Sequence, residues 1–190
     1  LPHLTIQQLR DKYADPVGKY ANIDGQEIYY KDEGTGPVLL MVHGSQSSLR
    51  TYDRIAEVLK DRYRIIRFDI PSWGLSGDVP ENVAQTLKPS DIPARLLAQL
   101  GVDKVDCVGV SSGGTMCLYL AAEHPELVNR LILSNMPSDP VKTDHLVQPE
   151  SFIKAQEDSN KRGYRDLHFW NEFLSYFAGD PARISEKTRE

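Results

Sequence analysis

The residues best suited to chemistry are the five at positions 109–113, which read Gly-Val-Ser-Ser-Gly. This is the Gly-x-Ser-x-Gly pattern of a nucleophile elbow, in which a serine occupies a strained turn between a strand and a helix. The positions two before and two after the serine must be small, because the turn leaves no room for larger side chains. That frame selects Ser111 as the candidate nucleophile, since shifting it to Ser112 would put Val110 at the first small position.

The sequence on both sides of Ser111 supplies the elements that such a turn needs. The apolar run at 105–108 predicts a strand leading in, and residues 115–122 predict a helix leading out. A helix that begins at the elbow points its first backbone N–H groups toward negative charge developing beside the serine. The five-residue pattern alone is common by chance, so this context carries the prediction.

Nucleophilic hydrolysis also requires a base, an acid that orients the base, and donors for the oxyanion. The segment His43-Gly44-Ser45 directly follows Val38–Val42, a continuous apolar run typical of a strand buried on both faces. We expect the backbone N–H of Ser45 to lie opposite that of Ser112. Two such donors would stabilise a tetrahedral oxyanion.

The elements around these loops predict an open, mostly parallel α/β sheet. Lys19–Ile23 and residues 26–31 read as an antiparallel hairpin, because the Asp24-Gly25 turn between them suits positive φ. Strands and helices then alternate, which is the pattern of parallel sheets with helical crossovers. The remaining expected elements are a leading helix over Ile6–Tyr13, a helix over about 51–59, a strand over 63–68, a loop over about 69–88, a helix capped by Ser90 and ending near 100, and a strand over 128–133.

After residue 137 the character of the sequence changes. Residues 138–190 are polar and helix-prone, with aromatic positions such as Phe169, Trp170 and Phe173, and they contain no strand-like run. We therefore expect two parts, 1–137 and 138–190.

Together these motifs resemble the α/β-hydrolase superfamily. The resemblance covers about residues 20–136 and lies in four ordered segments: His43-Gly44 after the third strand, residues 69–76 after the fourth, the elbow after the fifth, and residues 124–128 before the sixth. It implies an α/β-hydrolase fold truncated after about six strands, with 1–137 as the N-terminal part of the core and 138–190 as part of a helical cap (lid). It also implies that His43, Gly44 and Asp69 shape loops, and that His43 is not the catalytic base.

The resemblance leaves the base unassigned. In the family the catalytic His follows the eighth strand and the acid usually follows the seventh, so both are expected beyond residue 190 or on a second chain. Some members place the acid after the sixth strand, which makes Asp139 a candidate, the alternative being a turn residue before Pro140. The other histidines are expected at a terminus, at the end of the elbow helix or in the cap: His3, His124, His145 and His168.

Composition restricts partners and cofactors. The formal net charge of −5 disfavours a nucleic acid, and no apolar run is long enough to span a bilayer. Gly34-x-Gly36 lacks the context of a dinucleotide site, and no Cys/His spacing suits zinc, so we expect no cofactor and no metal. Cys107 and Cys117 are expected as buried free thiols. No signal peptide is visible; the cytoplasm is the favoured compartment, with export after signal removal left open.

Three functions are compatible with these residues. The first is a serine hydrolase that acts on a carboxylic ester or related acyl substrate through an acyl-enzyme, with these 190 residues inactive alone for want of the triad His. The second is a C–C bond hydrolase or a cofactor-free haloperoxidase or perhydrolase. The third is a non-catalytic ligand-binding protein. Haloalkane dehalogenases and epoxide hydrolases carry Asp where this chain has Ser111, which argues against those two activities.

A sheet that ends at the sixth strand has a physical consequence. Residues 128–133 would form an exposed apolar edge. Such edges aggregate or pair with another chain. We therefore expect low solubility for residues 1–190 alone, or a partner that covers this strand.

Overall fold

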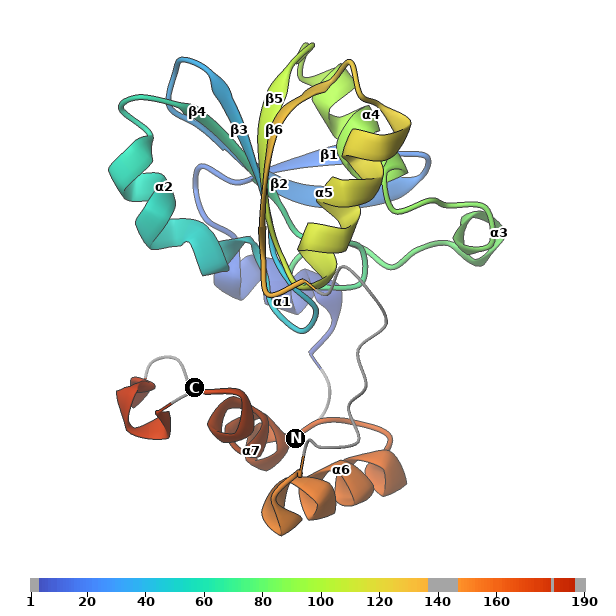
Figure 1. Ribbon diagram of the computed structural model, residues 1–190. Coiled ribbons are helices and arrows are strands. Elements are labelled where there is room, and N and C mark those ends of the chain that lie inside the picture. Colours follow the sequence, from blue (N-terminus) through green and yellow to red (C-terminus); the bar gives the residue numbers. More distant parts are fainter. Residues whose placement is uncertain (1–3, 137–146, 179, 187–190) are drawn as a thin grey trace. The chain divides into compact units, whose positions relative to one another are not determined.

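The computed structural model describes residues 4–136, 147–178 and 180–186. Contacts divide the chain into two compact units, Leu1–Ser138 and Asp139–Glu190. Figure 1 shows the sheet and its helices in the first unit and a group of helices in the second.

The first unit is built on one six-stranded sheet of order β1-β2-β4-β3-β5-β6. The hairpin β1–β2 and the pair β2–β4 are antiparallel, and all other neighbours are parallel, which confirms the predicted open α/β sheet. The turn between β1 and β2 has positive φ at both Asp24 and Gly25, as predicted. The strands are β1 Lys19–Ile23, β2 Gln26–Glu33, β3 Val38–Val42, β4 Arg64–Phe68, β5 Val105–Val110 and β6 Val128–Ser134.

Helices cover both faces of this sheet, with α4 and α5 on one face and α2 on the other (Figure 1). Short α3 lies within the segment that the sequence predicted as loop alone. The bounds are α1 Ile6–Tyr13, the 3₁₀ helix η1 Leu49–Tyr52, α2 Asp53–Leu59, α3 Glu81–Ala84, α4 Asp91–Gln99 and α5 Ser112–Glu123.

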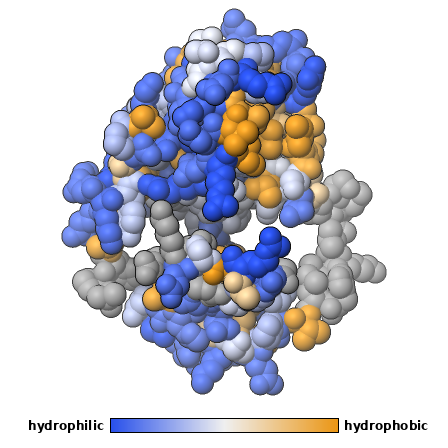
Figure 2. All heavy atoms as spheres, turned by 90° about the vertical axis from the view of Figure 1, so that its left-hand side faces the viewer, coloured by the Kyte–Doolittle hydropathy of each residue, from blue (hydrophilic) through white to orange (hydrophobic). Residues whose placement is uncertain are grey.

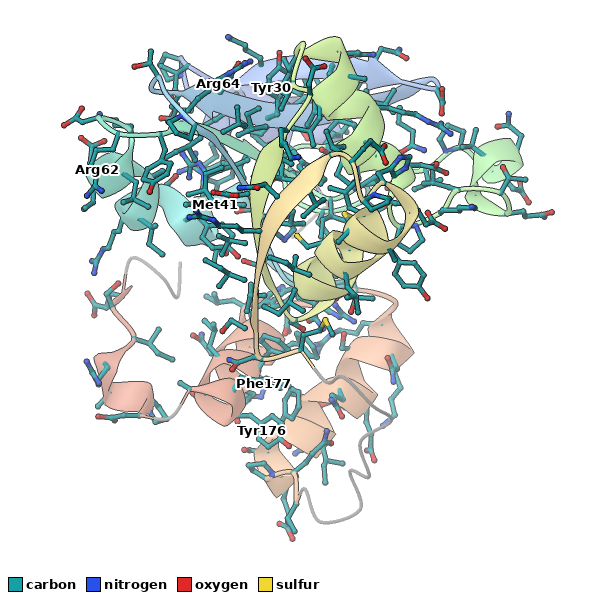
Figure 3. All side chains as sticks on the ribbon, turned by 45° about the horizontal axis from the view of Figure 1, so that its top comes forward. Tyr30, Met41, Arg62, Arg64, Tyr176 and Phe177 are labelled. Carbon is teal, nitrogen blue, oxygen red and sulfur yellow. The ribbon has the colours of Figure 1, made fainter. Side chains whose placement is uncertain are left out.

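Alternation along β3 divides the core between the two faces of the sheet. Leu40 and Val42 pack with α4 and α5, whereas Leu39 and Met41 pack with α2. Because successive side chains of a strand point to opposite faces, a run that is apolar at every position must be covered on both sides. Figure 3 labels Met41 on β3, and Tyr30 of β2 in the first of these clusters. Cys107 and Cys117 are buried free thiols, as predicted.

The predicted cap of α4 is wrong in one detail. Ser90 stands at the N-cap, but its side chain makes no capping hydrogen bond. Its hydroxyl donates instead to the carboxylate of Glu123 at the end of α5. A charged acceptor makes the stronger hydrogen bond, and it draws the hydroxyl away from the helix end.

The second unit packs around aromatic side chains. It consists of α6 Glu150–Arg162, α7 Leu167–Phe177 and the 3₁₀ turn η2 Pro181–Arg183, and its described residues include no strand. Phe152 and Phe169 are its buried rings, with Trp170, Phe173 and Tyr176 partly buried against them. The neighbouring rings of Tyr176 and Phe177, labelled in Figure 3, lie 4.8 Å apart between centroids. The aromatic positions noted in the sequence therefore form a small core.

Apolar side chains remain exposed on the first unit. On the edge strand β6, Ile132 is 59% exposed and Leu133 38%, and on α2 Ile55 and Val58 are exposed. Figure 2 looks onto the side that carries α2, where apolar residues form an orange patch. β6 is thus the apolar edge that the sequence predicted. Among the described residues, no helix is both long and apolar enough to cross a membrane.

Candidate active site

Ser111 occupies the sharp turn between β5 and α5. Its backbone has φ 52° and ψ −125°, a conformation that side chains with a Cβ rarely adopt. Two hydrogen bonds fix the turn, because the Ser111 N–H donates to the Ser134 carbonyl at 3.0 Å and its carbonyl accepts from the Thr115 N–H at 3.1 Å. The neighbouring strand and the first turn of the helix therefore hold the serine in a strained conformation.

The two glycines of the elbow are required by backbone contacts. A Cβ on Gly109 would lie 2.5 Å from the Gly113 carbonyl oxygen. A Cβ on Gly113 would lie 2.3 Å from the carbonyl oxygens of both Val42 and His43. The sequence predicted that the two small positions pack against each other. That holds for Gly109, but Gly113 is packed against the end of β3 and the loop after it.

The loop after β3 lies directly beside the candidate nucleophile. A Cβ on Gly44 would stand 3.1 Å from the Ser111 Cβ and 3.7 Å from its Oγ. The next residue bridges the two loops, since the Ser45 hydroxyl donates to the Ser112 hydroxyl at 2.9 Å. The structure thus brings together Gly44, Ser45, Ser111 and Ser112, as the sequence predicted.

The first turn of α5, directly after Ser111, is suited to bind negative charge. Ser112 is the first residue of α5, so its N–H has no acceptor within the helix and lies at the positive end of the helix dipole. The hydrogen bond between the Ser45 and Ser112 side chains holds the β3 loop against this helix end. Donors fixed in advance near a developing negative charge stabilise it without reorganisation.

His43 is fully buried and both of its ring nitrogens are engaged. The Ile70 N–H donates to Nε2 at 3.0 Å, which leaves Nδ1 to donate to the Gly44 carbonyl at 2.7 Å. Burial lowers the pKa of the His43 imidazole, although the Gly44 carbonyl acts in the opposite direction. The ring ties the loop after β3 to the loop after β4, and neither nitrogen is open to a proton from Ser111.

Asp69, directly after β4, organises the loop beside His43. Its Oδ1 accepts from the Leu49 N–H and its Oδ2 from the Leu75 N–H, both at 2.7 Å. Burial raises the pKa of this carboxyl to about 6, against the effect of the two N–H donors. Gly74 has φ +57°, and a Cβ there would lie 2.1 Å from the Asp69 carboxylate. Through these two hydrogen bonds the carboxylate joins η1 to the loop after β4.

Within the first unit, the described histidines include no side chain placed to serve Ser111. His124 ends α5, a helix of 12 residues that is about 18 Å long, and therefore lies far from the elbow. His168 belongs to α7 of the second unit. His3, His145 and the candidate acid Asp139 lie outside the described residues. The base and acid predicted as missing are not identified among the residues that the structure describes.

A pocket beside the elbow is a feature that the sequence motifs did not indicate. Its volume is about 390 Å³, and it lies wholly within the first unit. The only sequence signal for it is the spacing of Ser112, Thr115 and Met116, which places them on one face of α5. Its walls comprise Ile70, Pro71, Val79, Leu87, Lys88, Pro89, Ile92, Ser112, Thr115 and Met116. Within the described ranges, no cluster of His, Cys, Asp and Glu suits a metal ion.

Comparison with known proteins gives consistent results. A family model described as the alpha/beta hydrolase fold matches residues 37–188. The 2-hydroxy-6-oxononadienedioate/2-hydroxy-6-oxononatrienedioate hydrolase of Burkholderia vietnamiensis is 34% identical over 130 residues, 62% of this chain and 44% of that protein. The protein of the same name from Paraburkholderia phymatum is 32% identical over 189 residues, 90% of this chain and 62% of that protein.

The solved structures agree on the fold. A bromoperoxidase from Bacillus anthracis superposes with a TM-score of 0.72 at 26% sequence identity, covering 90% of this chain and 65% of that one. The chain thus spans 44% to 62% of the length of the two curated relatives.

Proposed function

Because the chain belongs to the α/β-hydrolase fold family, we propose that it is a hydrolase in which Ser111 attacks a carbonyl carbon of the substrate. The observation that carries the proposal is the φ of +52° at Ser111, kept by Gly109 and Gly113 where any Cβ would collide with backbone. Strain of this kind persists only where the surroundings enforce it, and it concentrates at functional sites.

The chemistry follows from the neighbours of Ser111. Its hydroxyl oxygen bonds to the carbonyl carbon while its proton passes to a base, and the carbonyl oxygen becomes an oxyanion. The backbone N–H groups of Ser45 and Ser112 receive that charge in this proposal. Collapse of the intermediate releases the leaving group, which takes up the proton, and water then hydrolyses the acyl-enzyme.

The base in this proposal is a histidine supplied by the rest of the protein, together with the acid that orients it. His43 does not fill this role, because its two nitrogens are bound to Ile70 and Gly44. Asp139 stays a candidate for the acid on sequence grounds alone.

Two substrate classes compete for this site. A carboxylic ester is the simpler proposal, because its leaving alcohol needs only a proton. A ketone whose C–C bond is cleaved is the second, and the relatives named as 2-hydroxy-6-oxononadienedioate hydrolases, 34% and 32% identical, favour it. That named compound is a dicarboxylate, so the C–C alternative for this chain calls for cationic groups that bind two carboxylates.

Labelling tests the proposed nucleophile. A fluorophosphonate probe should modify Ser111 in the full-length protein, with the site read by peptide mass spectrometry. Ser111→Ala should abolish labelling and lower kcat/KM by at least about 1,000-fold, while the melting temperature stays near that of the wild type. Unlabelled Ser111, with Ser111→Ala as active as the wild type, would overturn the proposed nucleophile. Absence of labelling and of hydrolysis in both proteins would leave the non-catalytic alternative.

Product analysis separates the two substrate classes. The full-length wild-type protein would be assayed on p-nitrophenyl esters and on a 2-hydroxy-6-oxo-dienoate, a substrate of the C–C class. The ester proposal expects the larger kcat/KM on the esters. Turnover of the dienoate alone, lost in Ser111→Ala, would replace the ester with a C–C substrate and keep the nucleophile.

A further inference from the structure

We propose that the pocket beside Ser112 binds an uncharged, apolar substituent of the substrate while the carbonyl lies at Ser111. The inference rests on the proposed function and adds to it the chemical class of one substrate group. At about 390 Å³ the pocket falls within the range of about 300–1,000 Å³ typical of small-molecule sites.

The position of the pocket links it to the reacting centre. Ser112 follows the candidate nucleophile directly and lines the pocket together with Thr115 and Met116. These residues stand at i, i+3 and i+4 of α5 and therefore share one face of the helix. A substituent in the pocket would extend from a carbonyl carbon at Ser111 along this face.

The lining favours an apolar group and disfavours a carboxylate. Apart from the Ser112 and Thr115 hydroxyls, the only polar side chain in the wall is Lys88. The Lys88 ammonium is largely exposed and lies 3.2 Å from the Glu123 carboxylate, so it leaves mainly its aliphatic stem to the wall. A carboxylate placed in the pocket would lose part of its hydration, and the cation of the wall, Lys88, is already paired with Glu123.

Two residues of the wall are anchored by contacts with the rest of the first unit. Ile92 is 1% exposed and belongs to the main core, and the Ile70 N–H is bound to His43. His43 in turn is bound to the Gly44 carbonyl of the oxyanion loop. Ile70 of the pocket wall and Gly44 of the loop after β3 are therefore joined through His43.

Substrate series in the full-length protein test the inference. The series consists of three p-nitrophenyl esters: the acetate, the hexanoate, and the monoester of hexanedioic acid, whose six-carbon chain ends in a carboxylate. We expect wild-type kcat/KM to favour hexanoate over the charged ester by at least about 100-fold, equivalent to about 2.7 kcal/mol. In Met116→Trp, which fills the pocket, the hexanoate-to-acetate ratio should fall by about tenfold or more.

Leu118→Trp is the matched control, because Leu118 lies on the same helix, is 41% exposed and is not part of the pocket wall. Its hexanoate-to-acetate ratio should equal that of the wild type. An unchanged ratio in a folded Met116→Trp protein would overturn the inference and leave the proposed function intact. Equal turnover of hexanoate and the charged ester would overturn it as well.

A binding measurement covers the case in which no ester is hydrolysed. The chain has three methionines, Met41, Met116 and Met136. With ¹³C-methyl methionine in Ser111→Ala, titration with methyl hexanoate should shift the Met116 methyl resonance to saturation, and the monomethyl ester of hexanedioic acid should not. Failure of methyl hexanoate to shift that resonance would refute the pocket assignment without reference to catalysis.

Discussion

The ends of β4 and β5, the two strands that flank β3, carry polar residues that the fold treats in opposite ways. Asp69 follows β4, is 1% exposed, and accepts two N–H hydrogen bonds. Ser111 follows β5, is exposed, and is positioned by its backbone conformation and by glycine packing. The loop after Asp69 and the turn at Ser111 both contact the segment His43-Gly44, which follows β3.

The difference shows that polar residues at one edge of the sheet divide into those that hold loops in place and those that can react with a substrate. A group whose lone pairs and protons are all engaged, like His43, stabilises loops and has nothing to offer a substrate. Ser111 is instead held by its backbone conformation, so its hydroxyl remains available to a substrate. The cost is conformational strain in the backbone. Residue type alone would rank the Asp and His above the serine as catalytic groups.

The largest expected effect comes from a substitution at Gly113, which belongs to the elbow that holds Ser111. In Gly113→Ala the new Cβ would lie 2.3 Å from the backbone oxygens of Val42 and His43, so β3 and α5 must separate. We expect the free energy of unfolding to fall by about 3 kcal/mol or more, measured by urea denaturation. Gly77→Ala is the control, since its nearest neighbour is 3.6 Å away, and a similar loss there would contradict the packing argument.

The second-largest expected effect comes from a substitution at Asp69. Asp69→Asn replaces one carboxylate oxygen by an NH₂ group that faces an N–H donor of Leu49 or Leu75. We expect the free energy of unfolding to fall by about 2 kcal/mol, because a buried donor loses its partner. Thermal denaturation measures the loss. Activity per folded molecule should persist, and its disappearance would assign Asp69 to the reaction.

A smaller effect concerns the protonation of His43. Burial lowers its pKa, so the folded state resists the proton that the unfolded state accepts near pH 6.5. Below that pH the group lowers the free energy of unfolding, by at most about 1.4 kcal/mol per pH unit. The contribution of Asp69 has the opposite sign, since burial raises its pKa to about 6 and its folded form takes up a proton first.

Because the contributions of His43 and Asp69 oppose each other, the free energy of unfolding does not isolate the protonation of His43. The ring resonances of His43, followed by NMR as a function of pH, measure that protonation directly. Because burial lowers the pKa, they should still show the neutral form, protonated at Nδ1, when the pH falls below 6.5. Titration of the ring at the ordinary pKa would show that one of its two hydrogen bonds is not formed.

The smallest expected effect comes from a substitution at Ser45, in the loop after β3. Ser45→Ala removes the hydrogen bond to the Ser112 hydroxyl but keeps the backbone N–H. Since an exposed hydrogen bond contributes about 1 kcal/mol or less, we expect kcat/KM on an ester to fall by about two- to fivefold with little change in stability. A loss above 100-fold would mean that the hydroxyl itself contacts the oxyanion.

The parts of the fold that depend on local conformation were predictable from the sequence. The Asp24-Gly25 turn, the doubly buried strand Val38–Val42 and the frame of the elbow follow from φ preference, periodicity and side-chain size. Each of these signals is complete within a few residues of sequence. Family resemblance added the ordering of the loops around them.

Features that depend on distant partners were not predictable in this way. The Ser90 hydroxyl binds Glu123, so Ser90 stands at the predicted N-cap of α4 without the capping hydrogen bond expected there. The N–H partners of Asp69 and the contact of Gly113 with β3 likewise join segments that are far apart in the sequence. The pocket beside Ser112 draws its wall from four separate stretches of the sequence, and no motif encodes such a combination.

The sheet order has a consequence for how the protein is made. Leu40 in β3 pairs on one side with Ile66 and on the other with Cys107. As the ribosome extends the chain from its N-terminus, β3 can acquire its first neighbour long before the segment with β5 has been synthesised. We therefore expect the nascent protein to complete its hairpin and β4 pairing first. The strained serine would form late, once β5 closes the open side of β3 and β6 supplies the Ser134 carbonyl.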